Sequence, residues 1–415
     1  MRVIKPRTQF EGEFTLPGDK SVTHRALMLN AVSRGEAIVT NALTGEDSLS
    51  TARCMRELGA KIEQDGTTFR VVGRQELLSE KTLDCGNSAT TMRLLTGLLS
   101  GKGVKAKLYG DKSLSSRPMA RVAEPLSLLG AKIKTSSGKP PVELFPVNLI
   151  GVDVRLEISS AQVKSAVLLA GVSAEGETRV SEPIKSRDHT ERMLKNMGAD
   201  LRVEGNTVTV KKSSLNAVDV EVPADISSAT YFMALGALKG KTLCKNVGVN
   251  ATRTGILRAF DKLGVKYSLL NRRICSGEDI ADILVEKSNL KGIELDGADV
   301  PSMIDELPLI ALLCAFADGE SHIRGAQELK IKESDRISAT AELINGLGGA
   351  CIPTEDGFII QGKKTLLGGE VNSRFDHRIA MTGAVALLAS KNGGVIHGAE
   401  SCAVSFPNFF ENLEV

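Results

Sequence analysis

Apolar positions along this 415-residue chain follow one pattern that recurs along its length. A helical stretch ends in a Leu-Gly-Ala-like corner, where glycine is favoured because a helix end often requires positive φ, and a β-branched extended run follows. The corners start at residues 58, 129, 197, 263 and 347. The pattern therefore predicts a repeating unit of roughly 70 residues.

A second pattern keeps step with the first. Each copy has a short extended run, a polar loop and a helix rich in Ala and Leu, at 17–33, 85–100, 158–173, 222–238, 300–317 and 375–390. A glycine and another β-branched run follow most of these helices, so each unit holds two helices and about four strands. A unit of this size cannot bury a core alone. We therefore expect six units in two closed lobes of three.

Composition narrows the class of protein. Lys and Arg total 52 against 50 Asp and Glu, and this balance gives no overall field for nucleic acid or an anionic membrane. Aromatic residues make up 4% of the chain and Trp is absent, so base-stacking surfaces are scarce. The longest apolar stretch, 307–317, is too short to span a bilayer, and residues 1–10 show no secretory pattern. We expect a cytoplasmic protein with neither a nucleic-acid nor a membrane partner.

The residues that usually ligate metals are scattered. The seven cysteines include no CxxC pair, and the five histidines lack the spacing of zinc ligands. The segment Gly236 to Thr242 approaches a phosphate-binding P-loop, but it is too short and follows a helix instead of a strand. The sequence therefore predicts no metal site and no nucleotide fold.

The polar loop before the first helix, 17–25, has the sequence Pro-Gly-Asp-Lys-Ser-Val-Thr-His-Arg. The first N–H groups of a helix lack intrahelical partners, and the helix dipole favours negative charge there. Lys20 supplies a mobile charge, Ser21 a hydroxyl that can cap the helix or bind a ligand, and Arg25 a planar fork for two oxygens. The loop predicts a phosphate or carboxylate site. The alternative is a capped surface helix with solvated charges.

The remaining helix starts and three basic clusters carry further polar groups. The helix starts are Asn87-Ser88-Ala89, Ser159-Ser160 with Gln162, Asp225 with Ser227 and Ser228, Asp305-Glu306, and Asp376-His377-Arg378; the clusters are 115–118, 186–189 and 332–336. Together they fit a doubly anionic substrate and acid/base chemistry. Simple helix caps, and a solvated helix face at 332–336, are the alternatives.

These strings resemble the enolpyruvyl transferases, in particular the branch that acts on shikimate 3-phosphate. The resemblance runs from residue 2 to the C-terminus and is carried by 16–25, 85–93, 117–118, 160–165, 186–191, 332–336 and 376–378. It implies an α/β fold, a two-lobed inside-out α/β barrel with six βαβαββ repeats, three per lobe. One lobe would be 19–228 and the other 1–18 with 229–415, with the active site in the cleft between them. It also implies that no metal or organic cofactor is required.

The reaction that the resemblance implies is transfer of the enolpyruvyl group of phosphoenolpyruvate to the 5-hydroxyl of shikimate 3-phosphate, with release of phosphate. The residues implied for shikimate 3-phosphate are Lys20, Ser21, Arg25, Ser160, Gln162, Arg187, Asp305 and Lys332. Those implied for phosphoenolpyruvate are Lys20, Asn87, Ala89, Arg117, Gln162, Arg336 and Arg378. We expect Asp305 to take the hydroxyl proton and Glu333 to move the proton at the methylene carbon, with Lys20 as a third catalytic residue.

Two positions depart from the family pattern. Val404 stands where many members have a lysine, so the phosphoenolpyruvate clamp has one fewer certain cation. Ala89 stands where herbicide-sensitive members have glycine, so we expect weak inhibition by glyphosate.

Two other functions and the state of assembly stay open. A sister enzyme transfers enolpyruvate to a UDP-amino sugar, but it would be expected to carry a cysteine within 110–119, where this chain has none. A non-catalytic repeat protein that binds a phosphorylated ligand is the other alternative. We expect a monomer.

Overall fold

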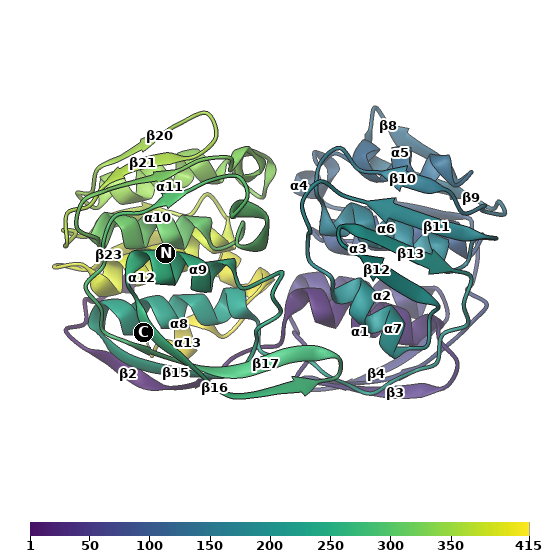
Figure 1. Cartoon of the computed structure of the whole chain (residues 1–415), viewed down its shortest axis with the longest axis horizontal. Coiled ribbons are helices and arrows are strands. Elements are labelled where there is room, and N and C mark those ends of the chain that lie inside the picture. The colour runs from purple at the N-terminus through teal and green to yellow at the C-terminus, as the bar shows by residue number, and fades with distance from the viewer. Residues whose placement is uncertain (415) are drawn as a thin grey trace. The chain divides into compact units, whose positions relative to one another are not determined.

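The computed structural model describes residues 1–414 and divides them into two compact units (Figure 1). Unit 1 consists of Met1–Pro17, Pro223–Ile274 and the residues from Asp279 onward. Unit 2 consists of Gly18–Val222 and Cys275–Glu278. No helix within residues 1–414 combines the length and the apolar character that a membrane span needs.

Unit 2 contains seven helices and twelve strands. The helices are α1 (Lys20–Val32), α2 (Glu46–Glu57), α3 (Ala89–Gly101), α4 (Lys112–Ser115), α5 (Ala120–Leu128), α6 (Ala161–Gly171) and α7 (His189–Asn196). The strands are β3 (Glu36–Thr40), β4 (Lys61–Asp65), β5 (Thr68–Val72), β6 (Lys81–Asp84), β7 (Ala106–Tyr109), β8 (Lys132–Ser136), β9 (Lys139–Phe145), β10 (Asp153–Arg155), β11 (Glu177–Ser181), β12 (Leu201–Glu204), β13 (Thr207–Lys211) and β14 (Val220–Glu221).

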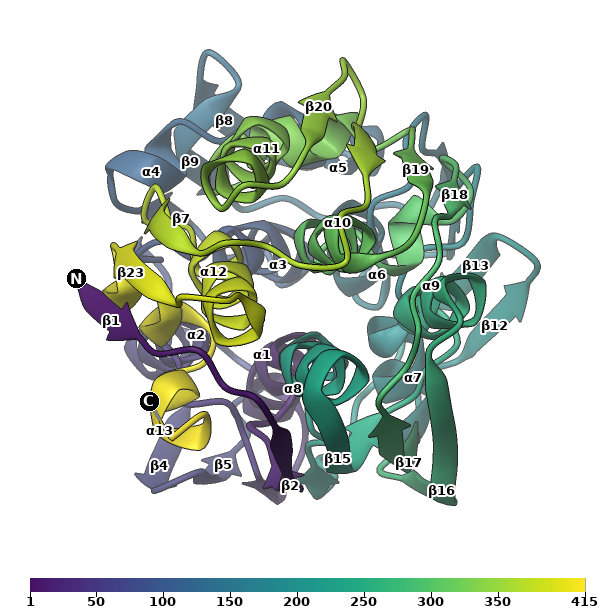
Figure 2. The same ribbon diagram turned by 90° about the vertical axis from the view of Figure 1, so that its left-hand side faces the viewer.

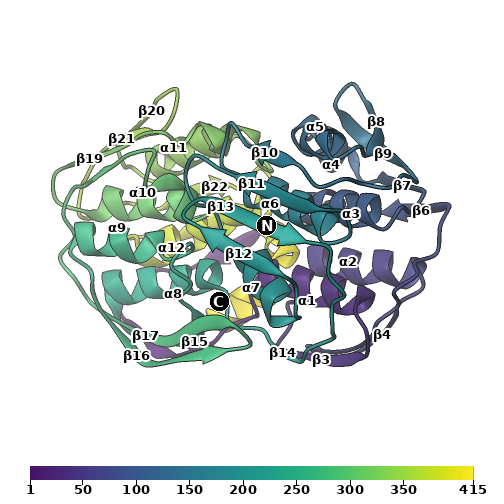
Figure 3. The same ribbon diagram turned by 45° about the vertical axis from the view of Figure 1, so that its right-hand side comes forward.

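The strands of unit 2 form three four-stranded sheets, in the orders β14-β3-β5-β4, β6-β7-β9-β8 and β10-β11-β13-β12. Each sheet begins with a parallel pair and ends with an antiparallel hairpin. Figure 3 shows the third sheet in front of α6, and the sheet contacts both α6 and α7.

The helices α1, α3 and α6 are buried almost all round, as expected for apolar helices at the centre of a fold. The backbones of α3 and α6 approach closely because Gly97 has no side chain: a Cβ there would lie 2.1 Å from the carbonyl oxygen of Ala166. The core of unit 2 therefore consists of helices, and the sheets lie outside them.

Unit 1 repeats this plan. Its helices are α8 (Ile226–Lys239), α9 (Gly255–Leu263), α10 (Leu307–Phe316), α11 (Arg336–Gly346), α12 (His377–Ala389) and α13 (Phe409–Asn412), with 3-10 turns at Val300–Ser302, Gln327–Ile331 and Ala399–Val404. Its strands are β1 (Arg2–Ile4), β2 (Phe10–Thr15), β15 (Gly240–Gly248), β16 (Lys266–Cys275), β17 (Glu278–Glu286), β18 (Glu294–Leu295), β19 (Glu320–Ile323), β20 (Cys351–Pro353), β21 (Phe358–Gln361), β22 (Gly369–Asn372) and β23 (Gly394–His397).

Figure 2 shows α8, α10 and α12 end-on at the centre of unit 1, with the strands toward its outside. Every residue of α10 and α12 is buried. The sheets have the orders β16-β17-β15-β2, β18-β19-β21-β20 and β1-β23-β22. The expectation of about four strands per unit is wrong for the last sheet, where β1 pairs antiparallel with β23 and no hairpin follows.

Two of the parallel pairs are completed by exchanged strands. The strand before α1 is β2, which pairs with β15 after α8; the strand before α8 is β14, which pairs with β3 after α1. The chain passes from one unit to the other directly after each of these strands. The predicted α/β fold, with six small sheets around central helices and three sheets in each unit, is confirmed.

Candidate active site

In the structure, the predicted anion loop places Lys20 as the first residue of α1. The residue that caps this helix is not the one that the sequence suggested. Asp19, not Ser21, caps α1, because its Oδ1 accepts a hydrogen bond from the N–H of Val22 at 2.9 Å. The Ser21 hydroxyl makes no hydrogen bond within residues 1–414, so it remains available to a ligand. Lys20 Nζ lies 3.2 Å from Oδ2 of the buried Asp47, which holds the ammonium group beside the helix end.

Arg25 lies one turn into α1 and is buried. Its Nε donates to Thr190 Oγ1 at 2.6 Å, Nη1 to the carbonyl oxygen of Ser21 at 2.9 Å, and Nη2 to Ser165 Oγ at 2.7 Å. Burial lowers the pKa of Arg25 to about 10, and Glu191 opposes that shift, so the guanidinium stays charged at neutral pH. A charged group whose hydrogen bonds all go to neutral partners attracts an anion.

Arg187 belongs to the same neighbourhood. It is half-buried in the segment before α7, and its positive charge contributes to the lowered pKa of Arg25. The structure thus brings together four of the residues predicted for shikimate 3-phosphate: Lys20, Ser21, Arg25 and Arg187.

A second group in unit 2 surrounds the start of α3. Arg117 Nη2 donates to Asn87 Oδ1 at 2.8 Å and to Ser113 Oγ at 3.3 Å, and Asn87 Nδ2 donates to Asp111 Oδ2 at 2.7 Å. Ala89 is the first residue of α3 and is buried. The cap of α3 is Ser88, so the simple capping alternative is correct for that residue.

Gln162, at the start of α6, joins this second group through a residue that the sequence did not single out. Its Nε2 donates to Thr90 Oγ1 at 2.9 Å, and its Oε1 accepts from Arg93 Nη1 at 2.5 Å. Arg93 Nη2 also donates to the carbonyl oxygen of Pro118 at 3.1 Å. The signal available in the sequence was the arginine one turn after Ala89, at the end of the matching string 85–93. Ser160 caps α6 and takes no part in the contacts of Gln162.

The predicted residues of unit 1 gather around Arg336, which is buried at the start of α11. Its Nε lies 2.8 Å from Asp376 Oδ2, Nη2 lies 2.6 Å from Glu333 Oε2, and Nη1 lies 3.5 Å from Asp305 Oδ1. Burial alone would lower the pKa of Arg336, but the carboxylates more than offset it and raise that pKa above its usual value. Asp305 and Glu333 therefore face the two terminal nitrogens of one guanidinium.

Two more predicted cations belong to this group. Burial lowers the pKa of Lys332, against the attraction of Asp305. Arg378 is buried in the first turn of α12, and its charge interacts with Asp305 and with the hydroxyl of Tyr231. Its Nε is buried with no hydrogen-bond partner within residues 1–414. Such an orphaned donor is costly to bury, so it fits a place that a ligand oxygen completes.

The helix start at α8 holds a network that sequence analysis did not assemble. Asp225 caps α8, and Arg253 Nη2 donates to Asp225 Oδ1 at 2.9 Å and to Ser227 Oγ at 2.8 Å. Ser227 in turn donates to Glu306. The capping alternative is correct for Asp225, and Arg253 itself carries no signal beyond an isolated arginine in a loop.

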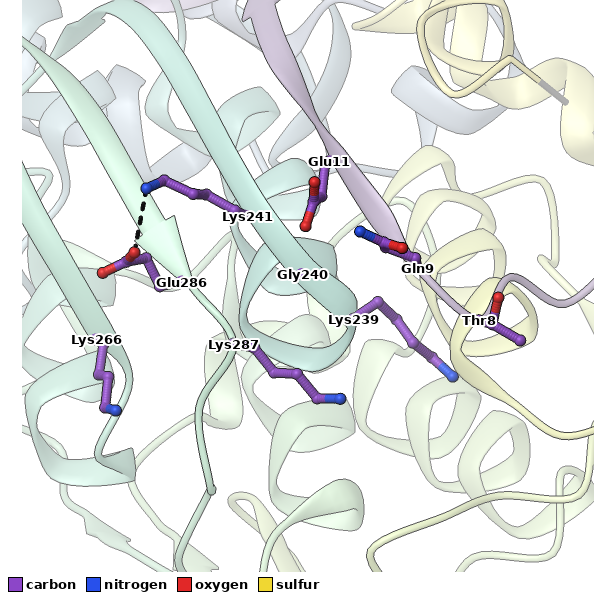
Figure 4. A pocket seen from close by; sticks show the side chains of 9 residues that line it. All are labelled: Thr8, Gln9, Glu11, Lys239, Gly240, Lys241, Lys266, Glu286 and Lys287. Atoms are coloured by element: carbon purple, nitrogen blue, oxygen red, sulfur yellow. Dashed lines mark ion pairs between the residues drawn. The ribbon is translucent and has the colours of Figure 1, made fainter.

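One hollow on unit 1 contains none of the predicted residues. It has a volume of about 530 Å³ and is lined by Thr8, Gln9, Glu11, Lys239, Gly240, Lys241, Lys266, Glu286 and Lys287 (Figure 4). Lys241 there pairs with Glu286 at 3.2 Å. A hollow of about 430 Å³ in unit 2 does include Ser160. Among residues 1–414, no group of three or more His, Cys, Asp or Glu side chains is placed to hold a metal ion.

The family model of EPSP synthase (3-phosphoshikimate 1-carboxyvinyltransferase) matches residues 4–413 of the chain. The chain belongs to the EPSP synthase family. It is 46% identical to the 3-phosphoshikimate 1-carboxyvinyltransferase of Desulforudis audaxviator, with 99% of this chain and 98% of the relative covered. It is also 46% identical to the enzyme of that name from Geotalea uraniireducens, with the same coverage.

Solved structures agree with this membership. The EPSP synthase of Acinetobacter baumannii superposes with a TM-score of 0.89 at 43% identity, covering 99% of this chain and 97% of the other. The enolpyruvyl transferase NikO from Streptomyces tendae has a TM-score of 0.79 at 19% identity, over 99% and 96% of the two chains, which shows the same fold.

Val404, where the resemblance led us to expect a lysine, ends a 3-10 turn. The following Phe406 is buried against Phe232 and Phe409. This packing anchors the segment with apolar contacts, and Val404 adds no charge.

Proposed function

We propose that this chain transfers the enolpyruvyl group of phosphoenolpyruvate to the 5-hydroxyl of shikimate 3-phosphate and releases phosphate. Membership of the EPSP synthase family supports the reaction. The two sets of cations and the carboxylates around Arg336 support the assignment of residues. The proposal requires the substrates to meet both sets, the predicted lobes 19–228 and 1–18 with 229–415 closing on them.

Unit 2 supplies most of the binding charge in this proposal. Lys20, Ser21, Arg25 and Arg187, with Ser160, hold the phosphate and hydroxyl groups of shikimate 3-phosphate, because Arg25 directs its own hydrogen bonds to neutral partners. Arg117, Asn87 and Gln162 surround the start of α3, where a phosphate or carboxylate of phosphoenolpyruvate is favoured. Lys20 serves both substrates.

Unit 1 supplies the proton transfers. Glu333, in its protonated form, gives a proton to the methylene carbon of phosphoenolpyruvate and becomes a carboxylate, and the 5-hydroxyl oxygen attacks the neighbouring carbon while Asp305 takes the hydroxyl proton. Glu333 then removes the proton from the methyl carbon as the C–O bond to phosphate breaks, so the double bond re-forms and phosphate leaves. Arg336 and Arg378 stabilise the negative charge of the departing phosphate, and Lys332 helps to bind shikimate 3-phosphate.

The single observation that carries the assignment is the position of Arg336. One buried guanidinium lies within 2.6 Å of Glu333 and 3.5 Å of Asp305, and each of these two side chains is about one-fifth exposed. Two carboxylates that share a cation yet remain accessible fit acid and base roles on a bound substrate.

The test is phosphate release from the purified protein with phosphoenolpyruvate, in parallel with shikimate 3-phosphate, a UDP-amino sugar, or neither. We expect release only with shikimate 3-phosphate. Release with the sugar nucleotide instead would overturn the choice of acceptor. If neither acceptor leads to phosphate release, the transfer itself is overturned.

The proposal extends to the state of the enzyme in the cell: a cytoplasmic monomer that uses no metal or organic cofactor. Light scattering on a size-exclusion column, with and without both substrates, tests the monomer. To test whether a cofactor is needed, turnover is measured after chelator treatment and dialysis. We expect it to be unchanged.

A further inference from the structure

Unit 2 contains a buried ion cluster that the proposed reaction does not use. Lys164, in α6, is 1% exposed. Its Nζ lies 2.7 Å from Glu182 Oε1, 2.8 Å from Glu191 Oε1 and 3.3 Å from the carbonyl oxygen of Ser186, and all three partners are buried. One ammonium group thus joins α6, the segment after β11 and the first turn of α7.

Burying this ion cluster in the core costs free energy of desolvation. Burial alone would lower the pKa of Lys164, but the two glutamates more than offset it and raise that pKa. Two carboxylates face one ammonium, and the second oxygens of Glu182 and Glu191 are buried without a hydrogen-bond partner within residues 1–414. Well-packed apolar side chains often serve stability equally well at such a place. The geometry that the cluster imposes is therefore its main consequence.

The cluster holds the backbone directly before Arg187, one residue of the anion site. Glu182 Oε1 accepts from the N–H of Ser186 at 2.7 Å while Lys164 donates to the Ser186 carbonyl, so both backbone groups of the residue before Arg187 are held. The cluster therefore fixes the base of the Arg187 side chain.

The same cluster also reaches Arg25. Ser165 follows Lys164 and Thr190 precedes Glu191, and these two hydroxyls lie 2.7 Å apart. Both accept from the Arg25 guanidinium, at 2.7 and 2.6 Å. Shifting α6 against α7 would thus move both oxygens that aim Arg25.

We infer that Lys164 is a positioning residue for shikimate 3-phosphate, one that aims Arg25 and Arg187 at the phosphate without touching it. The inference rests on the proposed function, which assigns those two arginines to that substrate. The phosphoenolpyruvate group around Asn87 and Arg117 is held by its own contacts, and Gln162 of α6 is bonded to Thr90 and Arg93 of α3, so this group stays in place when α7 shifts. Loss of Lys164 should therefore affect one substrate and spare the other.

The experiment compares steady-state kinetics of the full-length protein and its Lys164→Met variant. We expect the KM for shikimate 3-phosphate to rise at least ~10-fold, because a misaligned cation loses most of its contribution, while kcat and the KM for phosphoenolpyruvate change less than ~3-fold. An unchanged KM for shikimate 3-phosphate, or an equal rise in both KM values, would overturn the inference, since a merely structural role affects both substrates alike.

Two further variants keep the result interpretable. Lys107→Met removes a half-exposed ion pair with Glu143 in the same unit, 3.2 Å long, and should leave both KM values unchanged. Glu182→Gln keeps an oxygen that accepts from Ser186, so it should fold even if Lys164→Met does not, and should raise the KM for shikimate 3-phosphate alone by ~3-fold or more. Equal KM values in Glu182→Gln and wild type would also count against the inference. A wild-type protein that fails to turn over both substrates would overturn the proposed function instead.

Discussion

The two units share one architecture but surround their buried arginines with different partners. In unit 2, every hydrogen bond of Arg25 within residues 1–414 goes to a hydroxyl or a carbonyl oxygen. In unit 1, every such bond of Arg336 goes to a carboxylate, from Asp376, Glu333 or Asp305. Neutral partners orient a cation and leave its charge for a ligand, whereas carboxylate partners offset part of that charge.

In the proposed mechanism, this difference corresponds to a division between substrate binding and proton transfer. The six helices that follow the polar loops of the repeats are divided equally, three in each unit. Helix geometry alone favours anions equally at the starts of all six. In the proposed mechanism, the residues at those starts therefore give the units different roles: unit 2 supplies most of the cations that bind the substrates, and unit 1 adds the groups that move protons.

The largest expected effect comes from removing the cation of unit 1. Arg336→Met leaves the fully buried Asp376 without its partner, and breaking such a pair costs about 3–5 kcal/mol in free energy of unfolding. Urea denaturation followed by circular dichroism measures it.

The matched control is Arg70→Met, whose ion pair with Glu36 is roughly half-exposed; it should cost far less stability than Arg336→Met. Equal costs for the two variants would show that the Arg336 cluster is not held as tightly as its burial implies.

The next effect separates chemistry from binding. Asp305→Asn and Glu333→Gln should lower turnover at least ~100-fold, because each loses a proton-transfer group, while both substrates still bind. Rapid-quench kinetics and equilibrium titration give the two quantities separately. Near-normal turnover in either variant would remove that residue's proposed role.

A smaller effect concerns the start of α3. Ala89 is 7% exposed there, and we expect its methyl group to reduce the space for glyphosate, which is longer than phosphoenolpyruvate. Ala89→Gly should lower the inhibition constant of glyphosate about 10-fold, the effect of one methyl group in a tight pocket.

Ala120→Gly, at the first residue of α5, is the control and should leave inhibition unchanged. If Ala89→Gly is no more sensitive than the wild type, the steric explanation is wrong.

The smallest effect is the pH dependence of stability. Burial, with the nearby charges of Lys20 and Arg25, lowers the pKa of His24 in unit 2 well below its usual value. The unfolded chain then takes up a proton near pH 6.5 that the folded chain does not, so stability falls as pH drops below about 6.5, by about 1 kcal/mol at pH 5.5.

Asp376 in unit 1 behaves differently. Burial would raise its pKa, but Arg336 lowers it, so its contribution is complete above about pH 4 and is lost only below that. Unfolding midpoints from pH 7.5 to 3.5 should show the first loss in the wild type but not in His24→Gln. A His24→Gln protein with the wild-type slope between pH 7.5 and 5.5 would contradict the assignment to His24.

The sequence predicted the fold well because its repeats are local. Glycine corners and apolar helices mark each unit, and α10 and α12 are buried on every side as their composition indicates. The three-stranded last sheet was missed because its outer strand, β1, comes from the opposite end of the chain. The exchange of β2 and β14 likewise depends on long-range pairing, which spacing does not encode.

The candidate site was predicted mainly where motifs are contiguous, as in Lys20 to Arg25. Arg93, Asp47 and Arg253 were not singled out because each acts through a side chain far away in sequence: Gln162, Lys20 and Asp225 respectively. Lys164 was part of a matching string, yet its two glutamate partners become visible only when α6 and α7 pack.

The most direct test of the division between the units is the dissociation constant of shikimate 3-phosphate for two neutralised variants, measured by calorimetry. Arg25→Gln in unit 2 should bind it at least ~10-fold more weakly, the worth of a charge-assisted hydrogen bond, whereas Glu333→Gln in unit 1 should bind it within ~3-fold of the wild type. Wild-type affinity in Arg25→Gln together with lost affinity in Glu333→Gln would contradict the account.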